Sequence, residues 1–509
     1  MVGLMAGPNV AMTATEADGS AARAVGASRR FRLGVLAAVL LSIAFRIRFV
    51  FVAITTDEGG YLAAARAWRH GATPFVDVWV DRPQGLWAVY AAFDTLVGDA
   101  RWVRLLSLLF GALGVVAVGW AVRLAASDSA GVAAAVATAV ASSGPTIEGY
   151  AANGELLSAS VGAAAVAIAI AVLVGRLGPR WMGAAGVVGG LAWSIKQSGV
   201  DGPLAVCVWL VVAAIAGWLQ WRAAFAHLAR FAGGACVVLL LAMLHGASVG
   251  FSDWWYAIAG YRLEQRSVLT GAKWSNLGLT FPKAAPLLLP VLVLGAGIAL
   301  MARRTGKPVL ATKLAAVLLL WPLCALLTFA MGGQFFRHYW VTLTFPVAAL
   351  GGMLVAASGA TARRAALVVV VLAAAVPWAQ LAFLDGTDVP LEAGDGSRLT
   401  AAEHVGRWLA DRTEPGDTVY VMCAAANTYA YAGVDPPVRY LWSDGIRRAK
   451  GAQAELSALF ADSPPTWLVM FDKVTFCSAD PLVATVIAER YAGAIELDGV
   501  RILRLEDDG

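Results

Sequence analysis

The segment Thr55–Leu86, TTDEGGYLAAARAWRHGATPFVDVWVDRPQGL, directly follows the first long apolar run of the chain. The sequence on either side of it consists mostly of Ala, Val, Leu, Gly and Trp. Charged groups at a membrane boundary are costly to hold near lipid, so this segment is the first candidate for a functional site. The alternative is a solvated loop whose charges only keep it in water. Its charged residues include Asp57, Glu58, Asp77, Asp81 and Arg82.

The composition indicates a membrane protein. Apolar residues make up 59% of the 509 residues and charged residues 14%, and the mean hydropathy is +0.69. Soluble globular chains are nearer half apolar and a quarter charged. We therefore predict a polytopic α-helical membrane protein. The net charge of +5 does not indicate a nucleic-acid partner, because the basic residues lie in short loops between apolar runs. The sequence contains no Cys/His cluster with zinc spacing and no Walker-type glycine loop.

The apolar runs predict about eleven membrane spans. Residues 1–32 are interpreted as a cytoplasmic tail, because the run that follows is too long for the apolar core of a signal peptide. The predicted spans are 33–54, 103–122, 130–147, 156–175, 181–198, 203–220, 230–250, 284–302, 309–331, 340–358 and 365–383.

A further short run at about 84–98 decides the topology. If it does not span, the later basic groups all lie on the same side as the basic N-terminus, as the positive-inside rule requires. We therefore predict that 84–98 lies flat at the outer surface. The N-terminus is then cytoplasmic and the C-terminus extracytoplasmic, in a multi-pass protein of the plasma membrane. The basic groups are Arg123, Arg176, Arg180, Arg222, Arg303, Arg304, Lys307, Arg363 and Arg364.

The chain changes character after the last predicted span. Residues 33–383 form the predicted transmembrane domain, with 55–101 as its first outer loop, and 384–509 form an extracytoplasmic α/β domain. An amphipathic helix near 399–411, a turn and a buried strand are followed by the strand-like segments PPTWLVMFD and GVRILRL. This tail is interpreted as an accessory lid or docking domain. Its cysteines, Cys423 and Cys477, would form a disulfide in an oxidising compartment or remain two buried thiols.

Four separated segments place polar groups at the predicted outer face. Carboxylates and cations that converge there suit group transfer from an anionic lipid-linked donor: a carboxylate accepts the proton of a hydroxyl, and cations bind a phosphate. The first loop supplies catalytic candidates in Asp57 and Glu58. The candidates for phosphate binding are Arg82, Lys196, Arg337 and His338, and the supporting or metal-binding candidates are Asp81 and Glu155.

Each candidate also has a structural interpretation. Asp57-Glu58 would be an interfacial helix cap, and the negative charge of Glu155 would stabilise the N-terminus of the fourth span. Lys196 would reach towards the headgroups without a partner. The pair Arg337-His338 would anchor an aromatic belt.

The first outer loop resembles that of the GT-C-fold glycosyltransferases, in particular the relatives of the dolichyl-phosphate-mannose protein mannosyltransferases and the lipid A aminoarabinose transferases. The resemblance covers about the first 350 residues and weakens through Glu155 and Lys196. In the triplet Asp81-Arg82-Pro83, Arg82 stands where Lys is usual, and Pro-Gln replaces a second Pro. The matching residues are Asp57-Glu58, Tyr61, the segment 71–77 (GATPFVD) and Asp81-Arg82-Pro83.

The resemblance implies a GT-C-like transmembrane domain and a hexosyl or pentosyl transferase of the cell envelope. The donor would be a polyprenyl-phosphate sugar, transferred with inversion to a glycan, lipid or protein acceptor. Asp57 would be the base, with Arg82, Lys196 and Arg337 around the phosphate. Some members of the fold use a divalent metal, for which Asp57, Asp81 and Glu155 are candidates, and others use none. A transporter or flippase for a lipid-linked or anionic substrate is the alternative, although the sequence shows no internal repeat.

Overall fold

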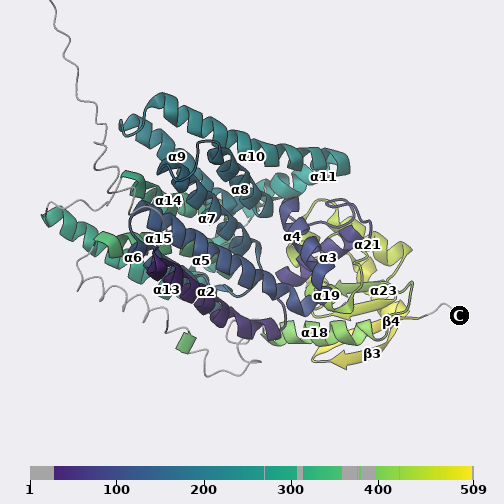
Figure 1. Ribbon diagram of the computed structural model, residues 1–509. Coiled ribbons are helices and arrows are strands. Elements are labelled where there is room, and N and C mark those ends of the chain that lie inside the picture. Colours follow the sequence, from purple (N-terminus) through teal and green to yellow (C-terminus); the bar gives the residue numbers. More distant parts are fainter. Residues whose placement is uncertain are drawn as a thin grey trace, which may run out of the picture.

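The computed structural model describes residues 28–268, 270–305, 313–357, 375, 378–379, 396–422 and 425–506. A bundle of long helices carries a smaller α/β domain at one end (Figure 1), which confirms the predicted fold class. The helices of the bundle are α2 (Arg29–Ile47), α5 (Leu105–Ala125), α6 (Asp128–Ala141), α7 (Gly154–Leu173), α8 (Trp181–Ile195), α9 (Asp201–Ile215), α10 (Trp221–Val249), α13 (Thr270–Thr305), α14 (Ala316–Gly332) and α15 (Trp340–Ala357).

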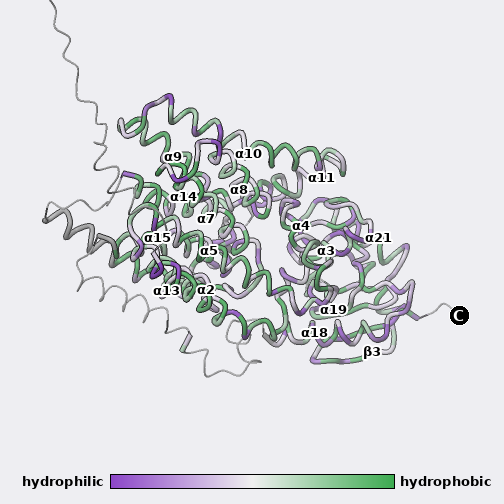
Figure 2. Tube along the Cα trace, in the orientation of Figure 1, coloured by the Kyte–Doolittle hydropathy of each residue, from purple (hydrophilic) through white to green (hydrophobic). Residues whose placement is uncertain are grey.

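Most of these helices are apolar along their length (Figure 2). Among the described residues, eight helical segments are long and apolar enough to cross a membrane. The helices α6 and α8 are apolar but have only 14 and 15 residues, about 21–23 Å at 1.5 Å per residue. They are shorter than the predicted runs 130–147 and 181–198. Helix α6 ends before Pro145, and Lys196 is extended after α8, with φ −151° and ψ 135°. Of the predicted run 365–383, only residues 375, 378 and 379 are described.

The interior of the bundle consists largely of small side chains. Helix α7 packs against both α5 and α8, and most of its buried residues are Ala, Gly or Ser. Without a hydrophobic driving force inside a bilayer, small residues let helices approach closely enough for dispersion and hydrogen bonding to hold them together. This close packing fixes where the helix ends, and the polar groups on them, lie.

Two short helices, α3 (Thr56–Arg69) and α4 (Gln84–Val97), connect the bundle to the α/β domain (Figure 1). The 14 residues of α4 extend about 21 Å, which is short of the ~30 Å hydrocarbon core of a bilayer. The helix ends at Gly98, whose φ of +73° favours glycine. Its length is compatible with the surface position predicted for 84–98.

The predicted topology can be measured with reporter fusions. A reporter placed after Gly98 is expected to be external and one placed after Arg180 cytoplasmic, because the basic loops then share the side of the N-terminus. Paired alkaline phosphatase and green fluorescent protein fusions distinguish the two sides. An external Arg180 fusion would contradict both the flat helix and a shared outer site.

The C-terminal domain contains a four-stranded sheet in the order β1-β2-β4-β3. Strand β1 (Val419–Met422) pairs parallel to β2 (Trp467–Met470), and β4 (Val500–Leu505) pairs antiparallel to β2 and to β3 (Tyr491–Leu497). The predicted helix and three predicted strands are thus confirmed. The fourth strand, β3, was not predicted, because all but its first residue remain at least partly exposed and its sequence YAGAIEL lacks an apolar alternation. The helices of the domain are α18 (Gly396–Ala410), α19 (Asn427–Ala432), α20 (Ser443–Arg448), α21 (Ala452–Asp462), α22 (Val474–Cys477) and α23 (Pro481–Arg490).

This domain is joined to the start of α3 by specific hydrogen bonds. The peptide N–H of Ile54 donates to the Tyr431 hydroxyl (2.8 Å), and the Asn427 side-chain amide donates to the Ile54 carbonyl (3.0 Å). A continuous apolar core runs from the bundle into the domain. Cys477 is buried and takes part in a disulfide, and its predicted partner Cys423 lies outside the described residues.

Candidate active site

The first turn of α3 separates the two neighbouring carboxylates, Asp57 and Glu58. Thr55 caps the helix in a capping box: its hydroxyl accepts from the Glu58 N–H (3.2 Å), and the Glu58 carboxylate accepts from the Thr55 N–H (2.8 Å). Glu58 is fully buried, whereas the Asp57 side chain is 28% exposed and lines a cavity. Burial raises the pKa of Asp57 above its ordinary value, and the nearby cations His338 and Arg82 partly oppose that rise.

The buried Glu58 carboxylate is fully engaged in structure. It accepts from the Ala152 N–H (2.8 Å) and forms an ion pair with Arg104, with 3.1 Å between Nε and Oε2. Arg104 also donates to the carbonyls of Phe49 and Ala53, at 2.6 and 2.7 Å. The pair therefore ties the end of the first span, the start of α3 and the segment before α7 together.

Replacing Glu58 with Gln is expected to destabilise the fold. The charge of Arg104 would remain buried without its counter-ion, at a cost of about 3–5 kcal/mol. The measurement is the apparent melting temperature of the detergent-solubilised protein. Glu403→Gln is the matched control, because Glu403 pairs with Arg407 on a partly exposed helix face. Equal melting temperatures for the two variants would contradict the structural role.

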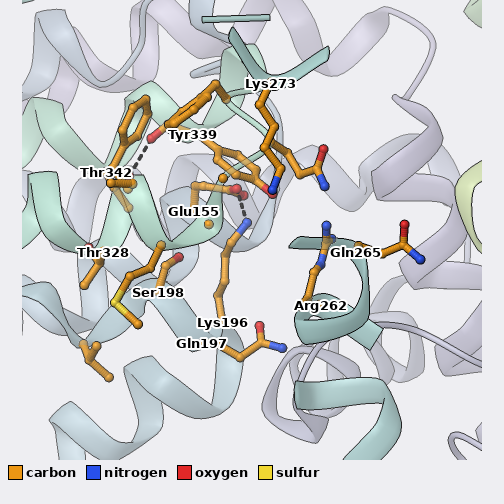
Figure 3. A pocket seen from close by; sticks show the side chains of 18 of the residues that line it. Glu155, Lys196, Gln197, Ser198, Arg262, Gln265, Lys273, Thr328, Tyr339 and Thr342 are labelled. Carbon is orange, nitrogen blue, oxygen red and sulfur yellow. Dashed lines mark hydrogen bonds and ion pairs between the residues drawn. The ribbon is translucent and has the colours of Figure 1, made fainter. Parts of the chain in front are cut away.

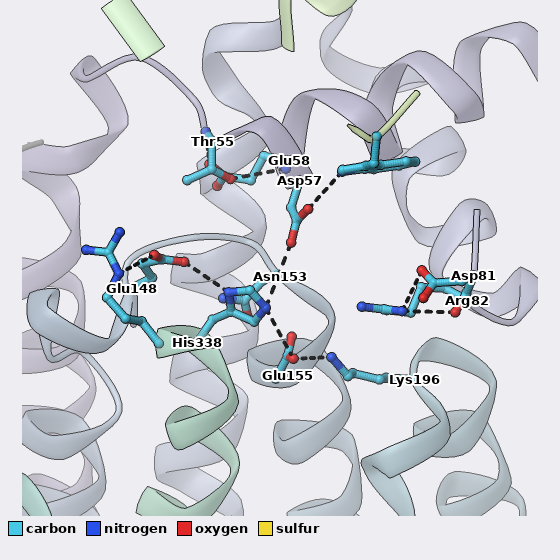
Figure 4. A network of polar contacts seen from close by, with 12 residues as sticks. Thr55, Asp57, Glu58, Asp81, Arg82, Glu148, Asn153, Glu155, Lys196 and His338 are labelled. Atoms are coloured by element: carbon cyan, nitrogen blue, oxygen red, sulfur yellow. Dashed lines mark hydrogen bonds and ion pairs between the residues drawn. The ribbon is translucent and has the colours of Figure 1, made fainter. Parts of the chain in front are cut away.

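His338 lies among three carboxylates (Figure 4). Its Nδ1 donates to Glu148 Oε2 (3.1 Å), and its Nε2 lies 3.6 Å from Glu155 Oε1 and 3.9 Å from Asp57 Oδ2. Arg337 pairs with Glu148, with 3.2 Å between Nε and Oε1. Glu148 has a positive φ of 56°, an uncommon conformation that costs energy and is often found at functional sites. Burial raises its pKa, but the bond and charge of His338 and the charge of Arg337 outweigh this and lower the pKa.

Arg46 holds the segment that presents Glu148. The Arg46 side chain is buried in α2, where its guanidinium donates to the carbonyls of Gly149 (2.9 Å) and Ser142 (2.8 Å). It also bonds the hydroxyls of Ser42, Ser142 and Ser143. A charge inside a bundle is tolerated when all its donors are satisfied in this way.

Lys196 and Glu155 form a second buried ion pair, and the Lys196 ammonium also lies 4.4 Å from the centre of the Tyr339 ring. Lys196 follows α8 and Glu155 lies in the first turn of α7. The side chain therefore points into the protein rather than reaching alone towards the headgroups.

Two arginines hold Asp81. Arg82 Nη1 lies 2.6 Å from Asp81 Oδ1, and Arg262, which belongs to α12 (Tyr261–Val268), pairs with the other carboxylate oxygen. Burial alone would raise the pKa of Asp81, but Arg262 and Arg82 together lower it to about 2. Arg82 is only 6% exposed and its Nε has no hydrogen-bond partner. That buried donor remains available to a ligand.

Two cavities meet at these arginines. The first, the Lys196 cavity, has a volume of about 600 Å³ and an otherwise largely apolar wall along α14. Figure 3 shows Lys196, Glu155 and Arg262 around it. The second, the Asp57 cavity, has a volume of about 540 Å³ and lies between the bundle and the C-terminal domain. Arg82 and Arg262 line both.

The structure distributes the predicted site residues between these cavities. Glu155 and Lys196 line the first, and Asp57, Asp81, Arg337 and His338 line the second, while Glu58 lines neither. The residues that sequence reasoning missed are Arg104, Arg262 and Trp442. The one sequence signal for Arg104 is its position at the start of a span, where a buried arginine needs a carboxylate partner. Arg262 and Trp442 lie in segments without a recognisable motif.

The three carboxylates proposed as metal ligands are engaged elsewhere. Asp81 is held by two arginines, Glu155 by Lys196, and Asp57 accepts from the Trp442 indole (2.9 Å). Within the described parts of the chain, no group of three or more His, Cys, Asp or Glu side chains is arranged to hold a metal ion. These residues therefore do not fit the metal-site hypothesis.

No protein-family model matches this sequence, and no curated protein matches it significantly. Solved structures do match. The crystal structure of ArnT from Cupriavidus metallidurans bound to undecaprenyl phosphate aligns with a TM-score of 0.63 at 16% identity, over 94% of this chain and 98% of that one. The oligosaccharyltransferase of Archaeoglobus fulgidus, tethered to an acceptor peptide, aligns with a TM-score of 0.55 at 13% identity, over 92% and 72%. These likenesses show that the chain has the GT-C fold.

Proposed function

We propose that this GT-C-fold membrane protein is a glycosyltransferase that moves a sugar from a polyprenyl-phosphate donor to an acceptor at the outer face of the plasma membrane. One observation carries the proposal: a cavity with buried cations and a cavity with a partly exposed carboxylate meet at Arg82 and Arg262. Transfer between two substrates needs such an arrangement, because the reacting atoms must approach from two sides.

The Lys196 cavity suits the donor. Its apolar wall along α14, with Phe329 and Met331, can accompany a lipid chain, while Arg82, Lys196 and Arg262 supply positive charge at one end. Guanidinium and ammonium groups bind phosphate through charge-assisted hydrogen bonds. The unpartnered Nε of Arg82 is a donor that a phosphate oxygen would satisfy. In ArnT, undecaprenyl phosphate is bound in a protein of the same fold.

The Asp57 cavity suits the acceptor. In the proposed reaction, Asp57 takes the proton of an acceptor hydroxyl while the oxygen of that hydroxyl attacks the anomeric carbon of the donor sugar. The bond from that carbon to the phosphate oxygen breaks, and the polyprenyl phosphate leaves with the bonding electrons. Arg82 and Lys196 stabilise the charge that develops on the leaving group. A single displacement from the face opposite the phosphate inverts the anomeric configuration.

The proposal also concerns the residues around Asp57. Arg337 and His338 hold Glu148, and His338 Nε2 lies 3.9 Å from Asp57 Oδ2, so we assign both residues to the acceptor side. The sequence predicted that Arg337 and His338 bind the donor phosphate. In this proposal they would do so only if the phosphate reached past Arg82 into the Asp57 cavity. Glu58 is assigned to support of α3.

The direct test is incubation of the purified full-length protein, in lipid nanodiscs, with a panel of radiolabelled polyprenyl-phosphate sugars. Glycan, lipid and protein fractions are then analysed for label. The expected result is label in one acceptor fraction, with an equal amount of polyprenyl phosphate released. Movement of intact donor across a vesicle membrane without cleavage would indicate a flippase instead and would contradict the proposal.

A further inference from the structure

We propose that the C-terminal domain is part of the active site, and that Trp442 is the positioning residue for the carboxylate of Asp57. This inference rests on the proposed function, in which Asp57 is the base. It differs from the interpretation of the domain as an accessory lid, because it assigns one of its side chains to the orientation of a reacting group.

The first observation is the contact itself. The indole Nε1 of Trp442 donates to Asp57 Oδ1 at 2.9 Å. An indole N–H is only a donor, so it favours the ionised carboxylate and cannot take its proton. With Oδ1 held, Oδ2 is the oxygen that faces His338, 3.9 Å from its Nε2. The contact therefore selects which oxygen is presented to the acceptor.

The second observation is that the glycine pair after Asp57-Glu58 receives the C-terminal domain. A Cβ on Gly60 would lie 2.4 Å from Cζ2 of Trp442, and one on Gly59 would lie 2.2 Å from the Cα of Asn427. The Tyr61 ring packs against the indole, with 5.6 Å between the ring centroids. The two glycines, part of the DEGG sequence, thus leave room for the indole and for α19 against α3.

The third observation is that this segment of the domain is also held by Trp79, in the loop between α3 and α4. The Trp79 N–H donates to the Arg439 carbonyl (2.8 Å), and Trp79 forms a parallel bridge with Tyr440. Ser443 and Asp444 continue from Trp442 along the wall of the Asp57 cavity. The indole is therefore fixed at its base as well as at its edge, which is what a positioning residue requires.

The test compares Trp442→Phe with wild type in the transfer assay. Phe retains most of the packing and loses the N–H. We expect kcat to fall about tenfold while the KM for the donor stays unchanged, because the donor lies in the other cavity. A hydrogen bond to the ionised form lowers the pKa of a carboxyl. Its loss should therefore move the acid limb of the kcat profile to higher pH, by about one unit.

The charged groups that face Asp57 from the other elements are unchanged in this variant. They are His338, Arg82, Glu155 and Glu148. A shift of the acid limb then reports the missing N–H. The matched control is Trp467→Phe, because the Trp467 indole makes the same bond to Asp417 (2.9 Å) in the same domain, away from the cavities. Its pH profile is expected to equal that of the wild type.

Gly60→Ala provides a second, independent variant. It keeps the indole but pushes it away from α3, so it should reproduce the shifted acid limb even if Trp442→Phe folds poorly. Gly233→Ala is its control, because a Cβ on Gly233 in α10 would meet no atom within 4 Å.

A folded Trp442→Phe or Gly60→Ala protein with the wild-type pH profile and kcat would overturn this inference. If Asp57→Asn abolishes transfer in the same assay, the proposed function survives that outcome. If Asp57→Asn also retains full activity, the proposed function itself fails.

Discussion

Asp57→Asn is expected to lower the rate of sugar transfer by about 10²–10⁴-fold, the usual contribution of a positioned general base. The acceptor hydroxyl is a poor nucleophile until its proton is being accepted. Asn keeps the size of the side chain, and its carbonyl oxygen can still accept from the Trp442 indole, so the local packing should survive. Donor binding should be unchanged, because the phosphate is assigned to the other cavity. The measurements are kcat for transfer and the Kd of the labelled donor.

Glu58→Gln is the informative comparison, because Glu58 is the adjacent carboxylate. Its loss should reduce the amount and thermal stability of folded protein, whereas each folded molecule should keep much of its turnover. Normal turnover in Asp57→Asn together with loss of turnover in stable Glu58→Gln would transfer the role of base to Glu58. Normal turnover in both would remove the assignment of this loop to glycosyl transfer.

Arg82→Ala is expected to weaken both donor binding and turnover, by about 10- to 100-fold in kcat/KM, as for loss of a hydrogen bond to a charged group. The effect differs from that of Asp57→Asn, because the phosphate is present in the ground state as well as in the transition state. Asp81 would still be paired with Arg262, so no buried carboxylate would be left without a cation. Titration of labelled donor and steady-state kinetics provide the two readouts.

Arg82→Lys should retain part of the donor affinity, because an ammonium binds phosphate as a point charge but lacks the Nε donor of Arg82. The control for removing an arginine is Arg101→Ala, whose side chain is 45% exposed and pairs with Asp99 at 3.6 Å. An unchanged donor Kd in Arg82→Ala would contradict the assignment of the phosphate to the shared wall of the two cavities.

The sequence predicted the parts of the fold that depend on local pattern. Long apolar runs, the change of character after the last span, and the strands WLVM and VRILRL all follow from composition and periodicity. The lengths of α6 and α8 did not, because the predicted runs 130–147 and 181–198 extend past the helix ends at Ala141 and Ile195 into short polar segments. Hydropathy averages over such breaks.

The candidate site was predictable in its members but not in its pairings. Sequence reasoning treated Asp57 and Glu58 as near equivalents, yet consecutive residues on a helix point in different directions. One lines the cavity, and the other is buried on Arg104. The contact of Trp442 with Asp57 spans 385 residues. No local sequence rule identifies it, because it depends on how the last domain docks against α3.

The peptide group of Ile54 is bonded at both its N–H and its carbonyl to residues 377 and 373 positions later in the chain. Domains at the N-terminus are generally synthesised and folded first. During synthesis, the first span and Asp57 therefore emerge long before Tyr431, Asn427 and Trp442 exist. Until the ribosome has finished most of the chain, the Ile54 peptide group of the newly inserted bundle lacks these two partners. The Asp57 carboxylate likewise lacks the Trp442 indole. Biogenesis thus delays assembly of the proposed catalytic end of α3 until the last domain has folded, so that a truncated or stalled polypeptide in the membrane would lack the Trp442 contact.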